Sequence, residues 1–302
     1  MSETAASLRR KIASAGELES VVRTMKAMAA SSIGQYENAV RSLDDYYRTV
    51  QLGLAACLRQ GESPGARTPV AKKKAGSIGA VVFGSDQGLV GQFNEGIVEF
   101  VVNTLENLPG KKTIWAVGER IQSHLADTDL LPARHFMLPN SISAITPLVG
   151  QILTEMETHR EKGEIAQIYL FHNRPESGAI YKPVSQRLLP LDSMWRRDLA
   201  EIVWPTKNPP EVMNGGEKTL PAFVREYLFV SLFRACAESL ASENASRLAG
   251  MQRAEKNIDE LLEELNRTFH RLRQSAIDEE LFDVVSGFEA LTSISDARKN
   301  SD

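Results

Sequence analysis

A glycine-rich loop after a buried apolar run is the first place where this sequence offers phosphate chemistry. Gly84, Gly88 and Gly91 lie between that run and Asn94. Backbone N–H groups of such loops cradle phosphates when the glycines follow G-x-G-x-x-G or G-x-x-x-x-G-K-[ST]. The three glycines have neither spacing. We therefore interpret the loop as a turn in which Asp86 caps nearby backbone.

Other candidates for chemistry fail on spacing. Gly215 to Thr219 reads GGEKT, but Glu217 separates glycine from lysine and no apolar strand precedes it. The five histidines fall on different predicted elements without metal-ligand spacing. No G-x-S-x-G follows a predicted strand, as a nucleophile elbow requires, and H-E-x-x-H does not occur. We predict no catalytic, cofactor-binding or metal-binding residue.

Composition restricts the class of protein. The 302 residues carry a net charge of −4, which argues against a general nucleic-acid binder. Two distant cysteines, Cys57 and Cys236, do not make a disulfide framework. With no apolar signal region and no run of about 18 apolar residues, we expect a soluble intracellular protein.

The middle of the chain has the alternating strand and helix pattern of an α/β fold. Nearly continuous apolar runs predict buried parallel strands at Ile78–Phe83, Thr113–Val117 and Gln167–Phe171. Helices are predicted between them at Phe93–Leu108, Glu119–Ala126 and Ser141–His159. A further strand or hairpin is predicted at Ile180–Leu191 and a short edge strand at Ile202–Trp204. Alternating strands and helices predict a Rossmann-like α/β domain with a mainly parallel sheet.

Two long helices flank this domain. Apolar residues recur at three- and four-residue steps from Leu8 to Val50, including Leu18 and Tyr46, and again from Leu228 to Phe288, including Leu261. This spacing predicts a long antiparallel coiled coil of the N- and C-terminal helices. The predicted domains are 1–59 (helix), 60–76 (linker), 77–215 (α/β) and 216–302 (helix).

The second helix is longer than the first by about twenty residues on this spacing, so its end has no partner helix. That end still carries apolar residues, among them Ile277, Leu281 and Phe282. Exposed apolar patches of that size mark interaction sites. The pattern predicts insertion into another protein.

Several motifs together resemble the γ subunit family of rotary F-type ATP synthases. The motifs are Leu8–Ile12 (LRRKI), Thr24–Ser31 (TMKAMAAS), Ser85–Asn94 (SDQGLVGQFN), Tyr227–Ala235, Glu238–Met251 (ESLASENASRLAGM), Arg273–Ile277 and Val285–Leu291. They cover both helices and the start of the middle domain. The C-terminal motifs are the most specific.

The resemblance implies a role without catalysis of its own. The coiled coil would be the central rotor shaft inside a hexamer of three α and three β subunits, whose β subunits make or hydrolyse ATP. The α/β domain would contact the ε subunit and the membrane c-ring, without nucleic acid or cofactor. The chain would then lie peripherally on the cytoplasmic face of the bacterial inner membrane.

The resemblance also implies which residues contact partners. Met25 and Lys26 would lie on the shaft face toward the β subunits, and Arg273 and Gln274 would contact a β-subunit loop. The apolar tip would turn in the sleeve of the hexamer through Val284, Val285, Phe288 and Leu291.

Departures from the family pattern point to a subtype. Val90 replaces the usual cysteine, and Ser31–Glu37 replaces a more basic run. The sequence from Met25 to Glu37 resembles the divergent N-type bacterial branch, which is associated with sodium transport, and leaves H⁺ or Na⁺ open as the coupling ion. Two other classes stay open: an α/β enzyme with a coiled-coil arm, and a coiled-coil scaffold.

Overall fold

The computed structural model describes residues 4–61, 77–176, 179–191, 195, 197, 199, 201–208, 210–213 and 216–299, and the side chains of the last helix as far as Gly287. Most of the predicted linker, 62–76, lies outside the described residues. The chain forms two compact units. Unit 1 comprises Met1–Ala27 with Met251–Asp302, and unit 2 comprises Met28–Gly250.

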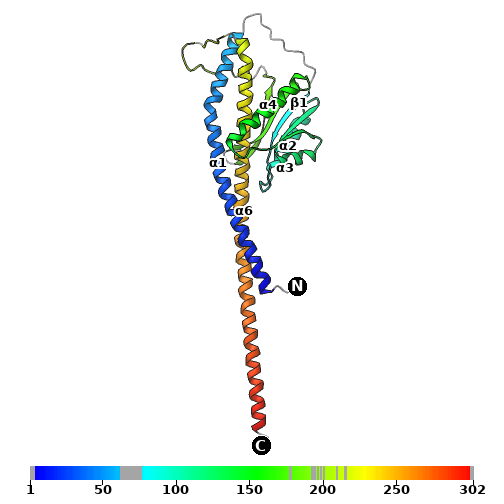
Figure 1. The fold of residues 1–302 in the computed structure, drawn as a ribbon, viewed down its shortest axis with the longest axis vertical. Coiled ribbons are helices and arrows are strands. Elements are labelled where there is room, and N and C mark those ends of the chain that lie inside the picture. The colour runs from blue at the N-terminus through cyan, green and yellow to red at the C-terminus, as the bar shows by residue number, and fades with distance from the viewer. Residues whose placement is uncertain are drawn as a thin grey trace. The chain divides into compact units, whose positions relative to one another are not determined.

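Two long helices contribute to both units. Helix α1 runs from Ala5 to Gly61 and helix α6 from Gly216 to Lys299 (Figure 1). They have 57 and 84 residues, far beyond the usual length of a globular helix. Their long proline-poor sequences and three- and four-residue apolar spacing explain this length.

Unit 2 contains a five-stranded sheet in the order β3-β2-β1-β4-β5. The strands are β1 (Ile78–Phe83), β2 (Lys112–Val117), β3 (Pro132–Phe136), β4 (Gln167–Glu176) and β5 (Ala179–Leu189). Strands β1 to β4 are parallel, and β5 runs antiparallel to β4 at the edge. The predicted α/β fold with a mainly parallel sheet is confirmed.

Two details of the predicted sheet are wrong. Strand β3 was not predicted, because this edge strand is largely exposed and its sequence, PARHF, is not continuously apolar. The segment Ile202–Trp204 is not a strand; its described backbone is irregular.

Helices cover both faces of the sheet, because successive side chains of the central strands point to opposite faces and both sets are buried. Helices α2 (Phe93–Glu106) and α3 (Glu119–Ala126) pack on the face that carries Ala80 and Val82 of β1. The opposite face carries Val81 and packs against α4 (Ile145–Glu161), which follows the short 3-10 helix η1 (Ile142–Ala144).

The unit 2 portions of α1 and α6 join this second core. Val50 and Leu54 of α1 and Leu232 of α6 are buried in the same cluster as the sheet residues. Tyr46 was predicted to lie in the seam, which is the line of residues on each helix that faces the other helix. It is instead 44% exposed, and Tyr47 packs against the core. The core-facing position before Val50 is therefore Tyr47 and not Tyr46. The sequence did not distinguish them, because either tyrosine fits a three- or four-residue step to Val50.

Both Cys57 and Cys236 are buried free thiols, and burial raises the pKa of each thiol. Among the described residues, no helix combines the length and apolarity needed to cross a membrane.

Candidate functional site: a partner interface on unit 1

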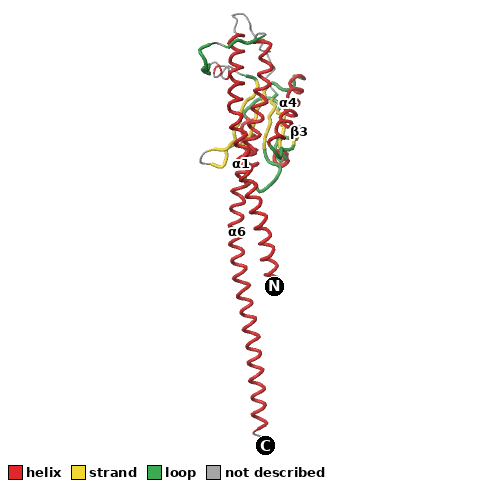
Figure 2. The backbone as a smooth tube through the Cα atoms, turned by 60° about the vertical axis from the view of Figure 1, so that its left-hand side comes forward, coloured by secondary structure: helices red, strands yellow, loops and turns green. Residues whose placement is uncertain are grey.

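Unit 1 is an antiparallel pair formed by the start of α1 and the second half of α6 (Figure 2). Leu8 and Ala15 of α1 and Met251 of α6 are buried. The Arg9 guanidinium lies over the ring of Phe269, 5.5 Å from its centroid, so these two residues lie side by side in the pair. A stripe repeating every three and four residues therefore holds this pair together.

Two predicted seam residues lie outside the seam of unit 1. Leu18 is 58% exposed and Leu261 is 47% exposed, whereas Glu19 and Leu262 are half-buried. Steps of four and three residues from Leu8 lead to Glu19 and then to Lys26. The prediction of these two positions was wrong because it used only apolar side chains, whereas this seam also contains the charged residues Glu19 and Lys26.

The charged seam positions form an ion-pair cluster. Lys26 Nζ donates to Glu255 Oε2 at 2.5 Å, and Arg23 Nε lies 3.5 Å from Glu255 Oε1. Arg23 also pairs with Glu19 on its own helix. The hydrogen bond from Lys26 lowers the pKa of the Glu255 carboxyl. Polar seam positions specify helix register in coiled coils.

Replacing the seam lysine tests this cluster. We expect Lys26→Met to lower the thermal midpoint of unfolding by about 3 °C at low salt, and by less at high salt because screening weakens the ion pair. Lys256→Met is the matched control, since Lys256 is 79% exposed and lies 3.7 Å from Glu260 on the same helix. Equal shifts for both variants would contradict a specific role for the seam pair.

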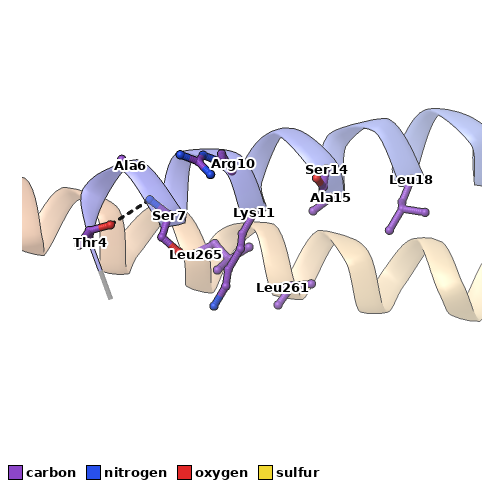
Figure 3. A pocket seen from close by; sticks show the side chains of 10 residues that line it. All are labelled: Thr4, Ala6, Ser7, Arg10, Lys11, Ser14, Ala15, Leu18, Leu261 and Leu265. Atoms are coloured by element: carbon purple, nitrogen blue, oxygen red, sulfur yellow. Dashed lines mark hydrogen bonds between the residues drawn. The ribbon is translucent and has the colours of Figure 1, made fainter. Parts of the chain in front are cut away.

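A groove of about 640 Å³ lies on one side of the helix pair (Figure 3). Its apolar lining includes Leu18, Leu261 and Leu265, and Arg10 and Lys11 also line it. Leu18 and Leu261, which were predicted to lie in the seam, thus line an apolar surface groove beside Arg10 and Lys11. In the sequence, the only sign of this exposure is that Leu18 and Leu261 lie one residue before the seam positions Glu19 and Leu262.

Helix α6 continues past the end of the pair. Every side chain from Arg273 to Gly287 is exposed, including Leu281 at 61%, Phe282 at 70% and Val284 at 70%. At ~1.5 Å per residue, the stretch from Arg273 to Lys299 is about 40 Å long. The predicted unpaired apolar end is confirmed over the described side chains.

The predicted contact residues fall into two patches of unit 1. Met25 and Lys26 are half-buried within the helix pair, and Lys26 is engaged with Glu255. Arg273 and Gln274 are exposed, about 27 Å along α6 from Glu255.

The tip residues belong to the second patch. Val284 and Val285 are exposed, whereas the side chains of Phe288 and Leu291 lie outside the described residues, although both positions are helical. Contact of any of the eight with a partner stays a prediction.

The glycine-rich loop of unit 2 is filled by its own side chains. Asn94 Oδ1 accepts from Ser85 N at 3.0 Å, and Asn94 Nδ2 donates to Ser85 Oγ at 2.8 Å. Asp86 accepts from the first backbone N–H of α3, at Glu119, and from Leu138 N. The loop is therefore a structural connection. Within the described part of the chain, no three His, Cys, Asp or Glu side chains gather as a metal site.

Comparisons with known proteins agree with this architecture. A family model described as ATP synthase matches residues 4–291. The ATP synthase gamma chain of Syntrophus aciditrophicus is 28% identical over 298 residues, covering 94% of this chain and 97% of the relative. That of Polynucleobacter asymbioticus is 24% identical over 289 residues, covering 94% and 98%.

A solved structure has the same fold. A chain of the Euglena gracilis mitochondrial ATP synthase, solved with its OSCP, F1 and c-ring parts, matches with a TM-score of 0.64 and 19% identity. The match covers 95% of this chain and 94% of that one. With the family model spanning nearly the whole sequence, this protein belongs to the gamma chain family of ATP synthases.

Proposed function

We propose that this chain is the non-catalytic central rotor shaft of an F-type ATP synthase. The observation that carries the proposal is the exposed apolar end of α6, where Leu281, Phe282 and Val284 face solvent. An exposed apolar stretch of this kind needs a protein sleeve. Family membership identifies that sleeve as the hexamer of α and β subunits.

The mechanism follows from the unequal sides of unit 1. One side has the apolar groove with Arg10 and Lys11, and the seam carries the Lys26–Glu255 pair. A rotor with unequal sides presents a different surface to each β subunit, so each catalytic site is biased toward a different conformation. Turning the rotor shifts these biases in sequence, which couples rotation to nucleotide affinity.

The remaining partners follow from the same family. The α/β domain of unit 2 would contact the ε subunit and the c-ring, and the chain would reach the membrane only through them. We infer that in a bacterium the chain lies on the cytoplasmic face of the inner membrane. The N-type, sodium-associated subtype is a proposal that rests on the sequence from Met25 to Glu37.

Purification from the native membrane tests the proposal. We expect the tagged chain to recover one copy of itself for three α and three β subunits, and electron microscopy of the complex to place a stalk on the hexamer axis. The purified chain alone should not hydrolyse ATP. Turnover by the isolated chain, or recovery without α and β subunits, would contradict the proposal.

A further inference from the structure

One face of α6 in unit 2 is polar although it is buried. Glu238, Ser242 and Ser246 lie four residues apart, on one side of the helix, and are 5%, 0% and 6% exposed. Buried polar side chains are destabilising unless they are hydrogen-bonded. Each of the three bonds to the α/β part of unit 2.

Glu238 is the hub of the first contact. Its Oε2 accepts from His172 Nε2 at 2.8 Å and from Arg174 Nε at 3.0 Å, both on β4. Its Oε1 accepts from Arg234 Nε at 2.8 Å, and Arg234 Nη1 donates to Asp44 Oδ1 of α1 at 3.0 Å. One carboxylate thus links the sheet, α6 and, through Arg234, α1.

The two serines make the second and third contacts. Ser242 Oγ donates to the carbonyl of Asn173 on β4 at 3.1 Å. Ser246 Oγ donates to the carbonyl of Val90, in the glycine-rich loop, at 2.6 Å. The three contacts extend for about 12 Å along the helix axis.

Protonation states support the hub. Burial alone raises the pKa of Glu238, but hydrogen bonds from His172 and Arg234 outweigh it and hold the pKa at about 2. Burial lowers the pKa of His172 despite the neighbouring carboxylate, because Arg174 and Arg234 already compensate that charge. Glu238 is therefore an anion that accepts from a neutral histidine.

Apolar packing and hydrogen bonding constrain a helix differently. The apolar cluster that joins α6 to the sheet resists a large turn of α6, because such a turn would expose Leu232 and Cys236. Since apolar contacts are non-directional, the cluster resists a small turn less. Hydrogen bonds weaken steeply when their angles change. Three of them on one helix face fix the rotation of α6 relative to β4.

We propose that Glu238, Ser242 and Ser246 form a torque joint, which transmits rotation between the α/β domain and the helix pair of unit 2. The inference rests on the proposed rotor function. In a rotor, a torsionally soft connection at this position would let ATP hydrolysis turn the helices without turning the domain equally. These three are positioning residues, since none touches nucleotide.

The test compares coupling with hydrolysis in the complete ATP synthase reconstituted in vesicles. For the triple variant Glu238→Gln, Ser242→Ala and Ser246→Ala, we expect the ratio of ATP-driven ion pumping to ATP hydrolysis to fall about fivefold. Glu238→Gln alone keeps the side-chain shape and should lower the ratio about twofold. If the triple variant does not assemble, the ratio measured for Glu238→Gln alone tests the proposal.

The control is Glu157→Gln. Glu157 on α4 lies 3.8 Å from Arg225 on α6, so it joins the same domain to the same helix, but at an exposed position. Its ratio should not change. A merely structural role would lower pumping and hydrolysis together through reduced assembly, so an unchanged ratio in the joint variants would overturn the proposal, as would an equal fall in the control.

Failure of the rotor function gives a different result. In that case the unsubstituted chain would not assemble with α and β subunits, or the assembled complex would not pump. Pumping by the unsubstituted complex with an unchanged ratio in the joint variants overturns the torque joint alone.

Discussion

Ending the chain after Leu272 is expected to lower ATP-driven ion pumping by the assembled complex about tenfold or more, because coupling needs differential contacts between rotor and hexamer. The stretch removed begins where the helix pair ends, and its described side chains, from Arg273 to Gly287, are all exposed. The isolated chain should therefore keep its thermal midpoint of unfolding.

A substitution variant separates the apolar tip from chain length. The triple variant Ile277→Ser, Leu281→Ser and Val284→Ser should reproduce most of the loss, because these side chains are 52%, 61% and 70% exposed and supply the apolar surface. Glu279→Gln with Glu280→Gln, in the same exposed stretch, is the control and should pump normally. Normal pumping by the serine variant would show that the tip does not engage a sleeve.

Replacing Glu238 by alanine is expected to destabilise the isolated chain by about 3 kcal/mol, the lower end for breaking a buried ion pair. Arg174 and Arg234 are 47% and 32% exposed, so water can solvate them after the loss, whereas the buried His172 cannot be solvated in this way. Urea unfolding followed by circular dichroism measures the change. A loss below about 1 kcal/mol would mean that the network has little net effect.

The same variant should change the pH dependence of stability. The folded pKa of Glu238, about 2, lies below its ordinary value of 4.5, so its stabilisation is complete above pH 4.5 and is lost as pH falls toward 2. The folded pKa of His172 also lies below its ordinary 6.5, so protonation of the unfolded chain lowers stability as pH falls below 6.5.

In Glu238→Ala the first of these two contributions is absent. We therefore expect the stability of the variant to fall less steeply than that of the unsubstituted chain between pH 4.5 and 2. Parallel curves in urea unfolding at each pH would contradict the assignment of that acid sensitivity to Glu238.

The sequence allowed the α/β fold and the two long helices to be predicted, because both rest on periodic apolar patterns. The core strands β1, β2 and β4 read as continuous apolar runs, since helices or the long helix pair cover both their faces. Strand β3 escaped prediction because an edge strand lacks that burial. The same reasoning placed the α6 overhang, since it needs only the relative lengths of the helices.

The charged parts of the molecule could not be predicted. Lys26 occupies a seam position that a hydrophobic pattern rejects, and its partner Glu255 is 229 residues away in sequence. Glu238 likewise reads as a solvated helix position until β4 is placed beside it, 66 residues earlier. Pairings of charges between distant segments depend on three-dimensional placement, which local periodicity does not contain.

Before the chain assembles with its partners, the exposed stretch of α6 should be the least stable part of this helix. A single helix without tertiary contacts is only marginally stable in water, since packing normally supplies most helical stability. Backbone amides from Arg273 to Gly287 should then exchange with solvent quickly, and proteases should cleave there first. A cell that makes this chain in excess of its partners would degrade the surplus from that end, which ties its abundance to theirs.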